Sequence, residues 1–163
     1  MKPRSRVPLT AFLAVLSLVS MVAISAWGYT VLGLAVARSQ GVYPTAEQGM
    51  LDRVRRGYLR IHDVDVLYAG PNSFDGSQPH IWYVIAEVRA DRRADGSALG
   101  KGGCDSPGSF FLNTKQGWVH VSEGAFPWIM GEFMTIFGLA GPGQSDPSTW
   151  WAPGQPAQHC QSA

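Results

Sequence analysis

Residues 7–37 read VPLTAFLAVLSLVSMVAISAWGYTVLGLAVA and decide where the rest of the chain lies. This stretch contains no Asp, Glu, Lys or Arg. An α-helix rises about 1.5 Å per residue, and about 20 apolar residues suffice to cross the hydrocarbon core of a bilayer. The stretch therefore predicts a transmembrane helix.

Basic residues around the stretch predict its orientation. Lys2, Arg4 and Arg6 precede it, whereas only Arg38 follows it directly. Positive residues tend to stay on the cytoplasmic side of a membrane. We therefore expect a single-pass protein of the cell membrane with its N-terminus in the cytoplasm.

This topology divides the chain into four parts. We expect a basic cytoplasmic end at 1–6 and a transmembrane signal-anchor at 7–37. An extracytoplasmic α+β domain at 38–140 follows, and a tail rich in Pro and Gly at 141–163 ends the chain. The lipid bilayer is thus the first expected partner.

A cleaved signal peptide is the competing interpretation of the N-terminus. The basic start and the small residues Ala35 and Ala37 both fit a signal peptide, and cleavage near Ala37 would give a secreted protein. The apolar region of a signal peptide is normally about 7–15 residues long. The longer stretch here favours an uncleaved anchor.

Charge is sparse and nearly balanced. The 163 residues include 13 Lys and Arg against 12 Asp and Glu, and charged residues make up 15% of the chain. A nucleic-acid-binding domain would be expected to show a basic patch or stripe. The composition argues against a nucleic-acid partner and leaves room for one modest domain.

A helix is predicted just after the anchor. Thr45 can accept a hydrogen bond from the backbone of Gln48 in a capping box, and Gly57 is a natural end. A basic cluster near that end fits the negative pole of the helix dipole, which explains it better than binding to lipid headgroups does. The cluster consists of Arg53, Arg55 and Arg56.

Four antiparallel strands are predicted next, at residues 58–68, 81–88, 110–114 and 118–122. The first alternates, with Val64, Val66 and Tyr68 on one face and two Asp residues on the other. The second is apolar on both faces, which is typical of a central strand. The last two are joined by a short loop that ends in Gly117 and predicts a hairpin.

A second apolar helix is predicted from Pro127, a favoured residue at the first helical position. It is too short to cross a bilayer, so it either packs on the sheet or rests on the membrane surface. A small domain needs apolar burial, which favours the core position. The resulting α-β-β-β-β-α order loosely resembles the helix-on-curved-sheet arrangement of cystatin-like domains.

The two cysteines, Cys104 and Cys160, are expected to form a disulfide if the domain lies outside the cytoplasm. Closing this loop of about 57 residues would stabilise the fold by about 4 kcal/mol in the chain-entropy model. The bond would also hold the otherwise irregular tail, with Trp150 and Trp151, against the domain.

No motif in the sequence assigns a catalytic residue, a metal site or a cofactor. The polar candidates are His62, Glu87 and His120, and Glu87 would face His62 if the first two strands paired in a suitable register. A cross-strand polar pair with a structural role is the simpler interpretation.

The function predicted from the sequence is binding, as an accessory component of an envelope complex with a protein partner. Trp128, Trp150 and Trp151 are the candidate interaction surface. A membrane-tethered hydrolase is the alternative enzyme class, and it would require the polar candidates to converge in one cleft.

Overall fold

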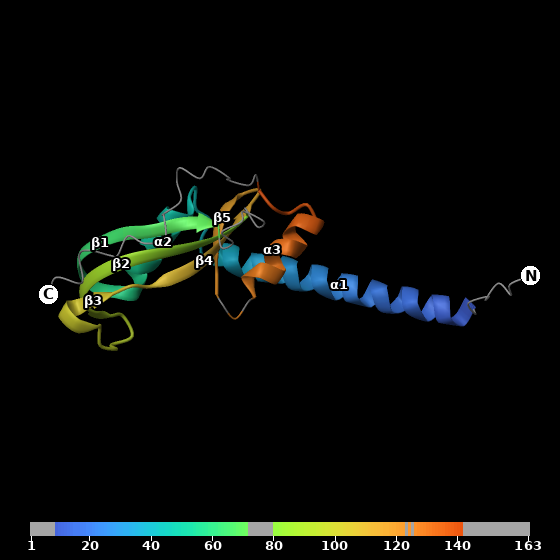
Figure 1. The fold of residues 1–163 in the computed structure, drawn as a ribbon, viewed down its shortest axis with the longest axis horizontal. Helices are drawn as coiled ribbons and strands as arrows, with labels where there is room; N and C mark the ends of the chain where they lie inside the picture. The colour runs from blue at the N-terminus through green and yellow to red at the C-terminus, as the bar shows by residue number, and fades with distance from the viewer. Residues whose placement is uncertain (1–8, 72–79, 123, 125, 142–163) are drawn as a thin grey trace, which may run out of the picture.

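The computed structural model describes residues 9–71, 80–122, 124 and 126–141. Figure 1 shows one long helix that projects from the end of an α+β domain. The basic end at 1–6 lies outside the described residues. So do Cys160, Trp150 and Trp151, and the disulfide and the tail surface therefore stay predictions.

Helix α1 (Leu9–Gln40) is unbroken and is long and apolar enough to cross a membrane. Over most of its length the large apolar side chains are exposed. The predicted apolar helix is therefore confirmed as a candidate membrane span.

The C-terminal third of α1 belongs to the domain. Thr30, Leu34 and Ala37 are buried, and their spacing of four and three residues places them on one face of the helix. Gly33 lies so close to α3 that a Cβ atom there would be 2.9 Å from Met130 Cε. This face of α1 is therefore covered by the chain itself.

Helix α2 (Ala46–Gly57) begins and ends where the sequence predicts. The Thr45 side chain accepts a hydrogen bond from the backbone N–H of Gln48 at 3.2 Å. Met50 and Val54 are buried against the sheet. The predicted capping residue and the predicted end at Gly57 are both confirmed.

The sheet is antiparallel, in the order β1-β2-β4-β5, with the short β3 paired to β2. The strands are β1 (Tyr58–Pro71), β2 (Ile81–Arg93), β3 (Cys104–Asp105), β4 (Gly108–Thr114) and β5 (Gly117–Val121). The four predicted strands are confirmed. In addition, β3 and a short 3₁₀-helix η1 (Lys101–Gly103) lie between β2 and β4, where the sequence predicts no element, since elements of two or three residues carry no periodic signal.

Two irregularities in the β1–β2 pairing change which face β1 residues occupy. Val66 lies opposite Ala86, but Tyr68 lies opposite Ile85. The β1 strand therefore advances by two residues where β2 advances by one. Such a bulge reverses the alternation of side chains. The prediction that Val66 and Tyr68 share one face is therefore wrong.

The sheet has a helix layer on each face. On one face α2 covers a core of Trp82, Val84, Ala86, Val88, Phe111 and Trp118. On the other face, the end of α1 and helix α3 (Pro127–Ile136) cover Ile81, Leu112 and Val119. Met130 and Met134 of α3 are fully buried there, as predicted for a helix that packs on the sheet.

Candidate functional site

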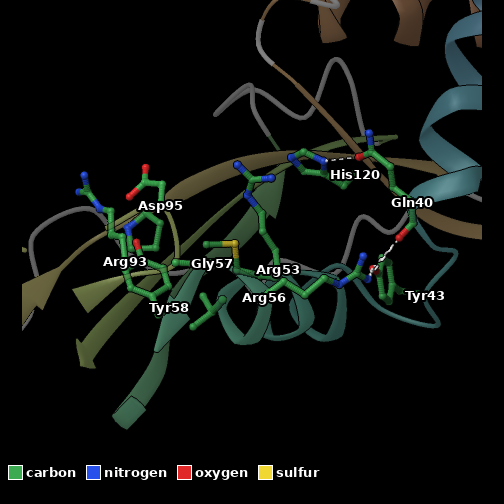
Figure 2. Close-up of a pocket in the computed structure, with 14 residues that line it drawn as sticks. Gln40, Tyr43, Arg53, Arg56, Gly57, Tyr58, Arg93, Asp95 and His120 are labelled. Carbon is green, nitrogen blue, oxygen red and sulfur yellow. Dashed lines mark hydrogen bonds between the residues drawn. The ribbon is translucent and has the colours of Figure 1, made fainter. Parts of the chain in front are cut away.

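A cavity of about 390 Å³ lies beside α2. Its walls come from the end of α1, the inner side of α2, the start of β1, the end of β2, and β5, as Figure 2 shows. Met50 and Val54 give the cavity an apolar wall. Elements distant in sequence therefore meet around one hollow, where several charged side chains also gather.

One edge of the cavity is closed by an arginine that is already neutralised. Arg56 forms an ion pair with Asp52 one turn earlier in α2, and its Nη2 also donates to the hydroxyl of Tyr43 at 2.9 Å. The Tyr43 hydroxyl in turn donates to Asp52 Oδ2 at 2.6 Å. Hydrogen bonds from Arg56 and Tyr43 hold the pKa of Asp52 below its ordinary value.

The opposite edge has the same three side-chain types. Arg93 lies 2.6 Å from Asp105 Oδ2, and the Tyr58 hydroxyl donates to the same oxygen at 2.6 Å. Burial and the hydrogen bond to Asp105 raise the pKa of Tyr58 to about 12. Burial alone would raise the pKa of Asp105, but the bonds from Tyr58 and Arg93 outweigh it, so its pKa is lowered.

Arg53 differs from these two arginines. It lines the cavity, and in the described part of the chain it forms no ion pair and no side-chain hydrogen bond, unlike Arg56 and Arg93. In Figure 2 its guanidinium points towards His120 between the two edges. It is therefore a positive charge without a carboxylate partner.

His120 completes the site from β5. Its Nδ1 lies 3.3 Å from Oε1 of Gln40, and its ring meets Phe111 edge-on with the ring centroids 5.7 Å apart. Burial, and then the charge of Arg53, lower the pKa of His120 to about 4. The imidazole is therefore neutral at physiological pH, and a proton on Nδ1 leaves Nε2 as a hydrogen-bond acceptor.

This arrangement suits the binding of an anion. It combines an unpaired guanidinium, which can pair with a carboxylate or phosphate group, and an apolar wall, which can contact an apolar part of the same ligand. A histidine with so low a pKa is a weak base at neutral pH. No group of three His, Cys, Asp or Glu side chains within the described ranges could hold a metal ion.

Of the predicted polar residues, only His120 lies at the cavity. His62 falls at a bulge in β1, and its Nε2 lies 2.7 Å from Asp91 Oδ1. Glu87 is buried opposite Asp65. In this register Glu87 lies three β1 residues away from His62, so the structure does not form the Glu87–His62 pair that the sequence suggested.

Trp128, the described member of the predicted interaction surface, lies away from the cavity on α3. Its side chain is exposed and meets Phe126 edge-on, with ring centroids 5.7 Å apart. The surface around it is thus distinct from the cavity.

Sequence reasoning missed the role of Arg53 by treating it as one of three arginines on a solvated helix face. A helical projection separates them, because Arg53 directly precedes Val54 and follows Met50 by three positions. Arg53 therefore lies at the margin of the buried face, whereas Arg55 lies far from it. That position is the signal that singles it out.

Comparisons of the chain with protein-family models, with curated proteins and with solved structures return no match. The functional argument therefore depends on the geometry of the site.

Proposed function

We propose that the chain is a single-pass membrane protein whose domain binds an anionic ligand in the cavity beside α2, as an accessory component of an envelope complex. The observation that carries the proposal is the unpaired guanidinium of Arg53 between two arginines that are each neutralised by aspartate. A bound carboxylate or phosphate would supply the missing partner.

The neutralised edges support this role because they fix the shape of the site. Each edge joins parts of the chain that are separate in sequence: Tyr43 to α2 at one edge, and Tyr58 to β2 and β3 at the other. Arg53 can then meet a ligand without a large rearrangement of its surroundings.

The membrane placement rests on α1 and on the charges around it. Lys2, Arg4 and Arg6 favour a cytoplasmic N-terminus, which puts the cavity outside the cytoplasm. The continuous helix would hold the cavity close to the bilayer, within reach of ligands or partner proteins in the same membrane. The low pKa of His120 makes it a weak general base, which favours binding over acid–base catalysis.

A binding measurement with matched probes tests the proposal. The full chain would be placed in nanodiscs of zwitterionic lipid and titrated with 4-phenylbutyrate and with its neutral amide, using empty nanodiscs as the blank. We expect the carboxylate to bind more tightly than the amide. Arg53→Gln should weaken carboxylate binding by about 10- to 100-fold, the equivalent of one charged hydrogen bond.

Arg55→Gln is the matched control, because Arg55 lies on the same helix and does not line the cavity. It should leave binding of the carboxylate unchanged. Equal losses in the two variants would show only a general effect of charge, and carboxylate and amide of equal affinity would contradict an anion site.

A further inference from the structure

Helix α3 presents apolar side chains on two sides. Pro127, Met130, Gly131 and Met134 are buried in the domain. The other side exposes large apolar residues, and Trp128 and Ile136 retain 43% and 69% of their accessible surface. This second face also includes Phe126 and Ile129. A group of exposed apolar side chains on a short helix is typical of an interaction surface.

The position of α3 relative to α1 indicates what covers it. Met130 packs at Gly33 of α1, and Figure 1 shows α3 beside α1 on the side of the domain from which α1 continues towards the N-terminus. Among the described elements of the domain, α3 lies nearest the projecting part of α1. The exposed face is thus next to the candidate membrane span.

The length of α1 sets where the bilayer surface would lie. The stretch from Leu9 to Tyr29 rises by about 30 Å, which matches the hydrocarbon thickness of a bilayer. Trp27 and Tyr29 are exposed at its end, and both residue types favour the membrane–water interface. Burial in the domain begins at Thr30, so no spacer separates the bilayer from the fold.

We infer that the exposed face of α3 lies in the headgroup region of the same bilayer that α1 crosses, with lipid as its occupant. This inference rests on the membrane-spanning part of the proposed function. Because α1 is unbroken and packed at Leu34 and Ala37, the domain has one orientation relative to the span. Its exposed apolar side chains then continue the apolar surface of α1.

The chemistry of α3 also specifies how it meets lipid. The helix contains no Lys or Arg, and Glu132 is its one charged residue. Contact therefore depends on insertion of aromatic and aliphatic side chains, not on attraction to anionic headgroups. The association should therefore be no stronger on anionic bilayers than on zwitterionic ones, because the negative charge of Glu132 gains nothing from anionic headgroups.

Quenching of tryptophan fluorescence by brominated lipid tests this inference. The full chain would be reconstituted in phosphatidylcholine vesicles that carry bromine near the headgroup end of the acyl chains. If Trp128 lies in lipid, Trp128→Phe removes a quenched emitter, so the quenched share of the emission falls. If Trp128 lies in water or against a second copy of the chain, the variant removes an unquenched emitter and that share rises, which would overturn the inference.

Three further measurements separate possible failures. Trp27→Phe should lower the quenched share wherever α3 lies, and absence of quenching in every variant would refute the membrane span itself. The unfolding temperature of Trp128→Phe should match that of the wild type, because Trp128 is exposed. Binding of 4-phenylbutyrate should not change in this variant, so the cavity and the lipid contact are tested independently.

Discussion

On one face of the sheet α2 leaves a cavity where charged groups meet, whereas on the other face α1 and α3 close an apolar core. The charged groups at the cavity are Arg53, Arg56 and Arg93, with Asp95. The opposite core includes Leu34, Leu112 and Met130. The difference is that one face packs the domain against α1, and the other leaves charged side chains around an open cavity.

The largest effect should come from truncating the α1 side of the apolar core. Leu34 is 1% exposed, whereas Leu32 on the same helix is 68% exposed. We expect Leu34→Ala to destabilise the domain by about 2–5 kcal/mol through lost burial and a cavity. Denaturant unfolding followed by fluorescence would measure this change. Leu32→Ala should leave the midpoint almost unchanged, and equal effects of the two would mean that α1 does not pack on the domain.

The next effect concerns the ionic edge at Asp105. Asp105→Asn weakens the bonds from Arg93 and Tyr58, and we expect a loss of about 1–3 kcal/mol. The wild type should also lose this contribution in acid. The pKa of Asp105 is lowered in the folded state, so its stabilisation is present above the unfolded pKa and disappears as the pH falls through the folded pKa. Below about pH 4 the free energy of unfolding should therefore fall less steeply with decreasing pH in the variant than in the wild type.

Two glycines of α2 should respond in opposite directions to alanine. A Cβ atom on Gly49 would lie 2.4 Å from Phe111 Cε1, so Gly49→Ala should destabilise by about 1–3 kcal/mol. Gly57 has no atom within 4 Å of that position, and Gly57→Ala should stabilise by about 0.4–1 kcal/mol. Thermal unfolding of the two variants would test whether α2 contacts the sheet closely at Gly49. Shifts of the unfolding temperature in the same direction would contradict that contact.

A small stability effect that depends on pH should come from His120. Its pKa of about 4 lies below the ordinary value of 6.5, so its neutral form favours the fold above pH 6.5 and that contribution is lost as the pH falls towards 4. We expect the free energy of unfolding to fall by on the order of 1 kcal/mol over that range. This fall should be absent in His120→Gln. Arg53→Gln should raise the pKa of His120 slightly in an NMR titration, because burial is the larger cause. An unchanged pKa would mean that the two side chains are farther apart than the structure places them.

Local features were predictable from the sequence. The Thr45 cap and the end of α2 at Gly57 depend on adjacent residues, and the apolar stretch that forms α1 is uniform over many turns. The same uniformity hid the buried stripe of Thr30, Leu34 and Ala37, because every face of that helix is apolar. Composition alone therefore did not show where the exposed part of α1 ends and the part buried in the domain begins.

Features that depend on long-range pairing were not predictable. The register of β1 against β2 places Glu87 opposite Asp65 and not His62, and a bulge that exists only in this pairing turns Tyr68 to the other face. Asp105 neutralises Arg93 from a two-residue strand that leaves no periodic pattern. The position of Arg53 on α2 could be read from the sequence, but the aspartate partners of Arg56 and Arg93 and the cavity between them required the fold.

The most direct test of the account is the NMR signal of the Arg53 Nε–Hε group in the full chain as 4-phenylbutyrate is added. The account predicts that this signal shifts and saturates with the affinity measured for binding, while the signal of Arg55 stays in place. Saturable binding that leaves the Arg53 signal unchanged would contradict the assignment of the cavity as the anion site.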